Sequence, residues 1–137
     1  MVIVPFIAMS CGAGETSNAN KVPQAKEQKS GTFTNVSVTD LNTAMSKGGD
    51  FIILDVRTPG ELAGGFVEGA ENIDINNSNF KSKAANLDKS KTVYVYCRSG
   101  IRSQNASKVL VSMGFTDVRN VEGGFNAWSQ KGYKSVK

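Results

Sequence analysis

The stretch Thr-Val-Tyr-Val-Tyr-Cys-Arg-Ser-Gly-Ile-Arg-Ser, residues 92–103, decides the fold of this chain. Its first five residues are all β-branched or aromatic, which predicts a buried strand. After Arg102, apolar residues recur with helical spacing at positions 106, 109, 110 and 113, and Gly114 is placed to end a helix. The stretch is therefore interpreted as a strand that enters a tight loop at Cys97 and continues into an amphipathic helix.

Further strands and helices alternate on both sides of this unit. Val36 and Val38 alternate as in a strand, and Thr39 is placed to cap a helix that ends at Gly48-Gly49. Residues 51–54 form an apolar run typical of a strand buried on both faces, and residues 58–61 have capping-box spacing. Helices are also predicted over 78–87 and 124–130, and a strand over 118–121. This alternation predicts an α/β fold with a mostly parallel sheet, in which sites lie beyond the carboxyl ends of strands.

The composition excludes several classes of chemistry. The chain has 137 residues, 39% of them hydrophobic, which suits one domain with a tail. Sixteen basic and 12 acidic residues leave a net charge of +4, which favours small anions but is too small to predict a nucleic-acid partner. The chain has no histidine and two cysteines, which excludes a Ser-His-Asp triad, a Cys-His pair and the common zinc sites. We therefore expect no metal and no cofactor, and a nucleophile that is activated in another way.

Residues 1–32 are predicted to be a signal remnant followed by a flexible tether, ahead of a domain at residues 33–137. The first ten residues are apolar and uncharged, and the run is too short to span a bilayer. The segment Ala-Met-Ser-Cys at positions 8–11 resembles a bacterial lipobox, and the polar residues 12–32 suit a tether. This predicts a bacterial cell-envelope or periplasmic protein with a lipid anchor at Cys11. The alternative is a frayed N-terminus with an ordinary thiol, in a cytoplasmic protein.

Three features of the loop favour a thiolate at Cys97. The first amides of the following helix have no helical partner and carry partial positive charge. Arg98 and Arg102 add full positive charges, and Gly100 allows the chain to curl so that successive amides form an anion-binding nest. We therefore expect the pKa of Cys97 to lie below the value of about 8.5 for a free thiol. The alternative is a buried structural cysteine beside two surface arginines.

The sequence Cys97-Arg98-Ser99-Gly100-Ile101-Arg102-Ser103 resembles the active-site loop of rhodanese-like domains. The resemblance extends to residues 55–62 and 65–70, and to Gly-Phe at 114–115 and Glu-Gly-Gly-Phe-Asn-Ala-Trp at 122–128, so that it covers almost all of residues 33–137. Phe66 stands where the family usually has histidine, and Glu68 where it usually has proline. The resemblance implies a rhodanese-like α/β fold, with a central, mostly parallel sheet of about five strands and helices on both faces.

The resemblance also implies a thiosulfate sulfurtransferase that carries sulfur as a persulfide on Cys97. Thiosulfate or a similar small anionic donor would supply the sulfur, and a thiol, cyanide or a protein acceptor would take it. Arg98 and Arg102 would bind the donor, and the amides of residues 98–103 would hold the persulfide. Asp55 and Arg57 are interpreted as support for a strand end, and Ser99 and Ser103 would either donate to the sulfur or cap the helix.

Three other functions stay open. One is a non-catalytic sulfur carrier or a regulatory binding module. Another is a phosphatase or arsenate reductase, although that class has five residues between the cysteine and an arginine, whereas four separate Cys97 from Arg102 and Ser103 stands in the place of that arginine. The third is a redox sensor, because a lone thiol of low pKa oxidises readily. Phe115, Phe125 and Trp128 are predicted to be core residues rather than ligand contacts.

Overall fold

The computed structural model describes residues 32–137. Residues 1–31, which include Cys11 and almost all of the predicted tether, lie outside the described residues. The lipid anchor and the tether therefore stay predictions from the sequence. The first strand of the domain begins at Thr34.

Five parallel strands form a central sheet in the order β2-β7-β6-β3-β5. The strands are β2 (Thr34–Val36), β3 (Phe51–Asp55), β5 (Glu71–Asn72), β6 (Thr92–Tyr96) and β7 (Asp117–Val121). The middle strand is β6, which aligns Tyr96 with Asp55 of β3 and Val95 with Asn120 of β7. Because all neighbours are parallel, the carboxyl ends of the strands meet at one edge of the sheet. The predicted α/β fold with a parallel sheet is confirmed.

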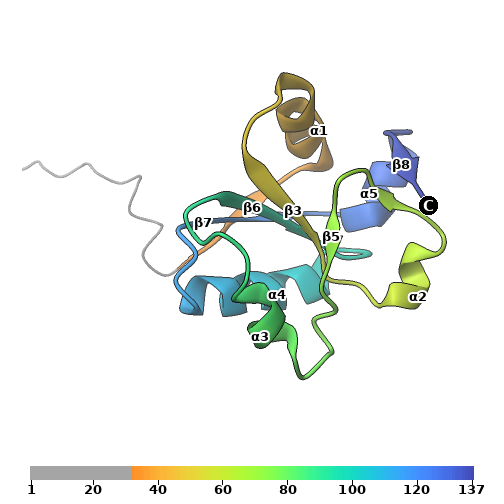
Figure 1. Ribbon diagram of the computed structural model, residues 1–137. Helices are drawn as coiled ribbons and strands as arrows, with labels where there is room; N and C mark the ends of the chain where they lie inside the picture. The colour runs from red at the N-terminus through yellow and green to blue at the C-terminus, as the bar shows by residue number, and fades with distance from the viewer. Residues whose placement is uncertain (1–31) are drawn as a thin grey trace, which may run out of the picture.

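Helices cover both faces of this sheet (Figure 1). On one face lie α1 (Val38–Lys47) and α5 (Gly124–Gln130), and on the other lie α3 (Phe80–Ala84) and α4 (Ile101–Ser112). The short helix α2 (Pro59–Leu62) follows the carboxyl end of β3, and β4 (Phe66–Val67) pairs antiparallel with β8 (Ser135–Val136) in a separate ribbon. Within residues 32–137 no helix is long and apolar enough to cross a bilayer.

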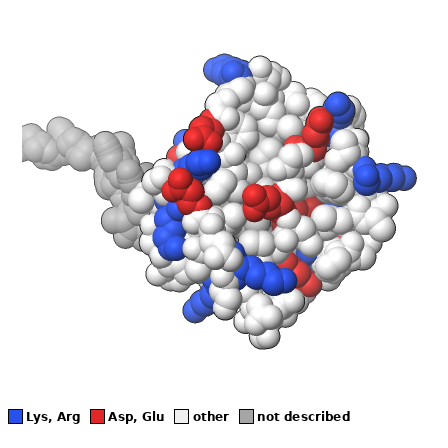
Figure 2. All heavy atoms as spheres, viewed as in Figure 1, with Lys and Arg blue, Asp and Glu red and all other residues white. Residues whose placement is uncertain are grey.

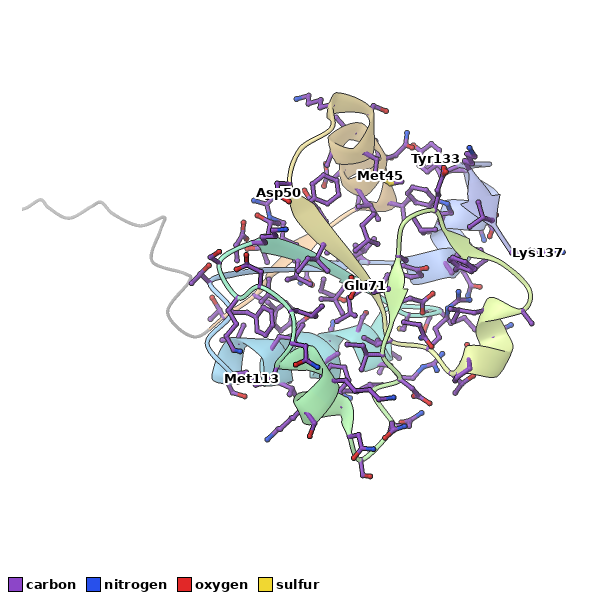
Figure 3. All side chains as sticks on the ribbon, in the orientation of Figure 1. Met45, Asp50, Glu71, Met113, Tyr133 and Lys137 are labelled. Atoms are coloured by element: carbon purple, nitrogen blue, oxygen red, sulfur yellow. The ribbon has the colours of Figure 1, made fainter. Side chains whose placement is uncertain are left out.

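The alternating side chains of β6 divide the core into two layers and set the direction of Cys97. Val93 and Val95 pack against α3 and α4, whereas Tyr94 and Tyr96 pack against α1 and α5. Because successive side chains of a strand point to opposite faces, Cys97 continues the Val93 and Val95 series toward α4. Figure 3 shows the two layers through their labelled residues: Met113 lies below the sheet, and Met45 and Tyr133 lie above it.

The start of α1 differs from the sequence expectation. The expected strand included Val38 and the expected cap was Thr39, but the strand ends at Val36 and Ser37 caps the helix. The Ser37 hydroxyl accepts from the amide of Asp40 at 3.0 Å, and the Asp40 carboxylate accepts from the amide of Ser37 at 2.9 Å. This reciprocal pair satisfies two amides that lack helical partners, and it places Val38 in the first helical turn.

Other predicted boundaries hold more closely. The strand over Thr92–Tyr96 and the helix over Gly124–Gln130 lie where the patterns placed them, and the capping box of Thr58 and Glu61 is present. The helix expected over 78–87 is shorter and spans Phe80–Ala84. On the face drawn in Figure 2, acidic and basic side chains are interspersed, so that this face carries no extended patch of one sign.

Candidate active site

Cys97 lies at the carboxyl end of β6, where the strand enters the cysteine loop, which we define as residues 97–103. Its side chain is almost completely buried, with 1% of the residue exposed. The loop turns into α4 through Gly100, which has a φ of 116° and stands at the N-cap. That left-handed conformation favours glycine, and the turn brings the first amides of α4 close to the sulfur.

The sulfur atom faces main-chain donors. The amide of Gly100 donates to Sγ of Cys97 at 3.0 Å, and Oγ of Ser103 lies 3.6 Å from the same sulfur. Burial would raise the pKa of Cys97, but hydrogen bonds from the Ser103 hydroxyl and from the amides of Gly100, Ser103 and Ser99 outweigh burial and lower this pKa. The site therefore favours a thiolate without an imidazole.

Ser103 serves two partners with one hydroxyl group. It is completely buried, and its hydroxyl donates to the carbonyl oxygen of Gly100 at 3.0 Å. A hydroxyl has a single proton, so it donates either to Gly100 or to an ionised sulfur at any one time. The two roles that the sequence left open, helix cap and sulfur donor, are thus both within reach of the same atom.

Main-chain amides at the N-terminus of α5 donate hydrogen bonds to carbonyl oxygens of the cysteine loop. The amide of Phe125 donates to the carbonyl oxygen of Cys97 at 2.8 Å, and the amide of Asn126 donates to that of Arg98 at 3.0 Å. Gly124 has a φ of 52°, and a Cβ there would overlap the carbonyl oxygen of Cys97 and lie 2.7 Å from that of Arg98. Only glycine allows the helix to approach the loop this closely, so Gly124 is part of the architecture of the site.

Asp55 and Arg57 form a buried ion pair at the end of β3, next to the end of β6. Nη2 of Arg57 lies 2.7 Å from Oδ2 of Asp55, and the two side chains are 4% and 0% exposed. Nη2 also donates to the carbonyl oxygen of Gly65 at 2.8 Å, and the guanidinium lies 4.5 Å from the centre of the Phe125 ring. Burial opposes the charge of Arg57, but its bonds to Asp55 raise its pKa. The pair ties together the elements that surround the cysteine loop.

Arg102 forms a bidentate ion pair with Glu61 of α2. Its Nη1 and Nη2 donate to the two carboxylate oxygens of Glu61 at 2.8 and 2.9 Å. Glu61 also accepts from the amide and the hydroxyl of Thr58 at 3.2 and 3.1 Å. The bonds from Arg102 lower the pKa of Glu61 to about 2, so this carboxylate is ionised at neutral pH. The charge of Arg102 is thus already balanced beside the loop.

Arg98 differs from Arg57 and Arg102 because its guanidinium has no hydrogen bond or ion pair within residues 32–137. It lines an open pocket of about 320 Å³. The other lining residues are Arg57, Glu61, Gly64, Phe125, Asn126 and Ser129. Within the described part of the chain, no group of three or more acidic, cysteine or histidine side chains could hold a metal ion.

The structure brings most of the residues singled out by sequence to one edge of the sheet. Residues 97–103, Asp55 and Arg57 all lie there, although Ile101 points outward and is 71% exposed, and Ser99 is also exposed. Sequence reasoning missed Glu61 as the partner of Arg102, and it missed Asn126 and Ser129 as pocket residues. Phe125, expected in the core, is half-buried and forms a wall of the pocket. In the sequence, the Gly123-Gly124 pair fits either a close backbone approach or a simple turn, and the structure shows the close approach at Gly124.

Comparison with known proteins gives a consistent result. A family model described as "Rhodanese-like domain" matches residues 37–131. "Thiosulfate sulfurtransferase GlpE" of Shewanella oneidensis is 34% identical over 99 residues, which cover 72% of this chain and 95% of that protein. "Uncharacterized protein YqhL" of Bacillus subtilis is 38% identical over 79 residues, and these span 58% of this chain and 61% of that protein. The crystal structure of a rhodanese-related protein from Thermoplasma volcanium superposes with a TM-score of 0.67 at 33% identity, covering 76% of this chain and 98% of that one.

Proposed function

The chain belongs to the rhodanese-like domain family, and we propose that it transfers sulfane sulfur through a persulfide on Cys97. Sulfurtransferase activity is supported at the level of the family by relatives named thiosulfate sulfurtransferase. The family also contains non-catalytic members, so chemistry in this chain is inferred from its own residues. The observation that carries it is the 3.0 Å contact between the Gly100 amide and Sγ of Cys97 in a loop that lowers the pKa of this thiol.

In the first step the thiolate of Cys97 attacks the outer sulfur of thiosulfate. A bond forms between the two sulfur atoms, the sulfur–sulfur bond of thiosulfate breaks, and its electron pair leaves with sulfite. The products are a persulfide anion on Cys97 and sulfite, which together carry the same total charge as the thiolate and thiosulfate. The Gly100 amide and its neighbours, already turned inward, would stabilise this anion without a reorganisation of the loop.

In the second step a nucleophilic acceptor takes the outer sulfur. A thiolate or cyanide attacks that atom, and the electron pair of the broken bond returns to Sγ of Cys97. The enzyme is regenerated, so the two half-reactions follow a ping-pong scheme. Arg98, as the unpaired guanidinium at the pocket, would attract the anionic donor, whereas Arg102 would act through its ion pair with Glu61.

The structure offers less support for phosphoryl transfer. The position that would carry the phosphate-binding arginine is Ser103, whose hydroxyl is bonded within the loop to Gly100. The nearest arginine in sequence, Arg102, is bound to both oxygens of Glu61. A phosphate dianion would have to compete with that carboxylate for the same guanidinium.

The proposal is tested by loading the full-length protein with thiosulfate and measuring the mass of the peptide that contains Cys97. We expect this peptide to gain one sulfur atom, and to lose it when cyanide is added. A Cys97→Ala variant should fold and show no transfer, and a Cys11→Ala variant is the matched control that keeps full transfer. Transfer by Cys97→Ala at the parent rate would overturn the assignment.

The N-terminal prediction carries a separate proposal about location. We propose that Cys11 is lipidated and anchors the domain to a bacterial membrane through the tether, on the basis of the lipobox-like residues 8–11. Expression in a bacterial host with a labelled lipid precursor tests this: label should enter the parent and be absent from Cys11→Ala. Absence of label in both proteins would contradict the anchor.

A further inference from the structure

The pocket beside the cysteine loop is larger than thiosulfate needs. Its volume of about 320 Å³ lies within the range of sites that bind organic small molecules, about 300–1,000 Å³. The pocket extends from Arg98 of the loop to Asn126 and Ser129 of α5. Arg98, the neighbour of Cys97, is the residue of the cysteine loop that lines the pocket, so an ion as small as thiosulfate or cyanide bound beside Arg98 would leave the α5 end of the pocket unfilled.

The charges around the pocket leave one cation without a partner. Arg57 is paired with Asp55, and Glu61 is paired with Arg102. Arg98 is the lining cation that no described acidic side chain neutralises. A ligand that fills the pocket is therefore expected to carry a negative charge close to Arg98.

Two further polar groups of the pocket are also unused. The side-chain amide of Asn126 and the hydroxyl of Ser129 form no hydrogen bond within the described residues, and both line the pocket. They stand three residues apart on α5, so they lie on the same face of the helix. The main-chain N–H of Asn126 donates to the carbonyl oxygen of Arg98 at 3.0 Å, which holds this face of α5 next to Arg98 and leaves the side-chain amide of Asn126 available. Three side chains that can donate hydrogen bonds thus line one pocket, together with Phe125 as an apolar residue.

We infer that this pocket is the acceptor subsite and that it selects a low-molecular-mass organic thiol that bears a carboxylate. The inference rests on the proposed sulfurtransferase function. The carboxylate accepts charge-assisted hydrogen bonds from Arg98 and bonds from Asn126 and Ser129, while the apolar stem of the acceptor lies along Phe125. The thiol end then faces the cysteine loop.

The transfer step in this subsite needs no additional reagent. The thiolate of the acceptor attacks the outer sulfur of the Cys97 persulfide and forms a new sulfur–sulfur bond. The bond between that sulfur and Sγ of Cys97 breaks, and its electron pair stays on Sγ. The acceptor leaves as a persulfide anion and Cys97 returns to the thiolate, so charge and atoms balance.

The test compares two acceptors that differ in one charged group. The full-length protein is loaded with thiosulfate, freed of excess donor, and discharged with either 3-mercaptopropionate or the uncharged 3-mercaptopropan-1-ol. The loss of sulfur from the Cys97 peptide is followed by mass, and the rates are corrected for the thiolate fraction of each acceptor. We expect the carboxylate acceptor to discharge the parent about tenfold faster, as charge-assisted hydrogen bonds predict.

Variants assign this selectivity to the pocket. Arg98→Gln, Asn126→Ala and Ser129→Ala should each lower the ratio of the two rates by about threefold or more, since the first removes the positive charge and the other two each remove a hydrogen-bonding side chain. Gln130→Ala is the matched control, because Gln130 is an exposed neighbour of Ser129 on α5 that does not line the pocket. This control should keep the parent ratio.

The possible outcomes distinguish a failure of the acceptor subsite from a failure of the proposed sulfurtransferase function. Equal rates for the two acceptors in the parent would overturn the subsite. It would also be overturned if Asn126→Ala and Ser129→Ala left the rate ratio unchanged, or if Gln130→Ala lowered this ratio as much as they do. If thiosulfate fails to load Cys97 at all, the proposed sulfurtransferase function itself is wrong.

Discussion

Two neighbouring segments at the carboxyl edge of the sheet use their polar groups in opposite ways. In residues 55–61, the support segment, each charged side chain is bound to a partner: Asp55 to Arg57, and Glu61 to Arg102. In the cysteine loop, the amide of Gly100 faces the sulfur and the guanidinium of Arg98 is unpaired. We infer that the support segment contributes stability, while the cysteine loop keeps the Arg98 guanidinium available for a ligand. Changes in the first should alter unfolding, and changes in the second should alter transfer.

The largest effect is expected at the buried ion pair. Asp55→Asn leaves Arg57 as a buried charge without its partner, and breaking one side of such a pair costs about 3–5 kcal/mol. Urea unfolding at pH 7 measures this loss. The control is Asp50→Asn, which breaks the pair with Lys91 at a side chain that is 81% exposed, and should cost far less because solvent screens this pair. Similar losses in the two variants would contradict the role of burial in the support segment.

The next effect concerns the contact between α5 and the loop. Gly124→Ala places a Cβ against the carbonyl oxygens of Cys97 and Arg98, so we expect a loss of about 3 kcal/mol together with slower sulfur loading. Gly132→Ala is the matched control, because Gly132 also has a positive φ, of 74°, but its Cβ would meet no atom within 4 Å. It should lose only the cost of the left-handed backbone, about 1–2 kcal/mol, and should load sulfur like the parent. Equal loading rates in both variants would show that the loop tolerates the displacement.

A smaller effect with a pH signature is expected at Glu61. Its pKa is about 2 in the folded protein, below the ordinary value of 4.5, so its ion pair with Arg102 stabilises the fold above pH 4.5. This stabilisation should be lost progressively as the pH falls from 4.5 through about 2, because the carboxylate of the folded protein is then protonated as well. Glu61→Gln should therefore lower the free energy of unfolding by about 1–2 kcal/mol at pH 7, after allowance for solvent screening, and by almost nothing near pH 2. A difference that is constant across this pH range would contradict the assignment.

The smallest effect on stability is expected at Arg98. Arg98→Ala removes an exposed side chain without a partner, so the free energy of unfolding should change by less than about 0.5 kcal/mol. The KM for thiosulfate should nevertheless rise severalfold, since the anion loses its unpaired guanidinium. Steady-state kinetics with thiosulfate and cyanide measure this change. An unchanged KM would remove Arg98 from the proposed donor site.

The local patterns of the sequence predicted much of the fold because they agree with the tertiary structure. The strand Thr92–Tyr96 and the helix that begins after Gly100 are specified by residue type and spacing within a short window. The start of α1 was predicted wrongly, because the capping box of Ser37 and Asp40 was overlooked in favour of alternation at Val36 and Val38.

The different partners of Arg57, Arg98 and Arg102 could not be predicted from the sequence. Arg98 and Arg102 look equivalent in the loop, and only the fold brings Glu61, 41 residues upstream, to Arg102 and leaves Arg98 unpaired. The approach of α5 likewise depends on packing between segments that are distant in sequence. Such contacts produce no periodic pattern in the local sequence from which they could be predicted.

The pH dependence of Cys97 alkylation shows whether the cysteine loop ionises this sulfur. The rate at which iodoacetamide modifies the Cys97 peptide reports the thiolate fraction, and it should show a midpoint below the value of about 8.5 for a free thiol. The midpoint should rise in Ser103→Ala, because a donor to the sulfur is lost, and should stay at the parent value in Ser112→Ala, whose hydroxyl lies at the far end of α4 and bonds to Val109. A parent midpoint at or above that of a free thiol would contradict the claim that the loop amides and Ser103 keep this sulfur ionised.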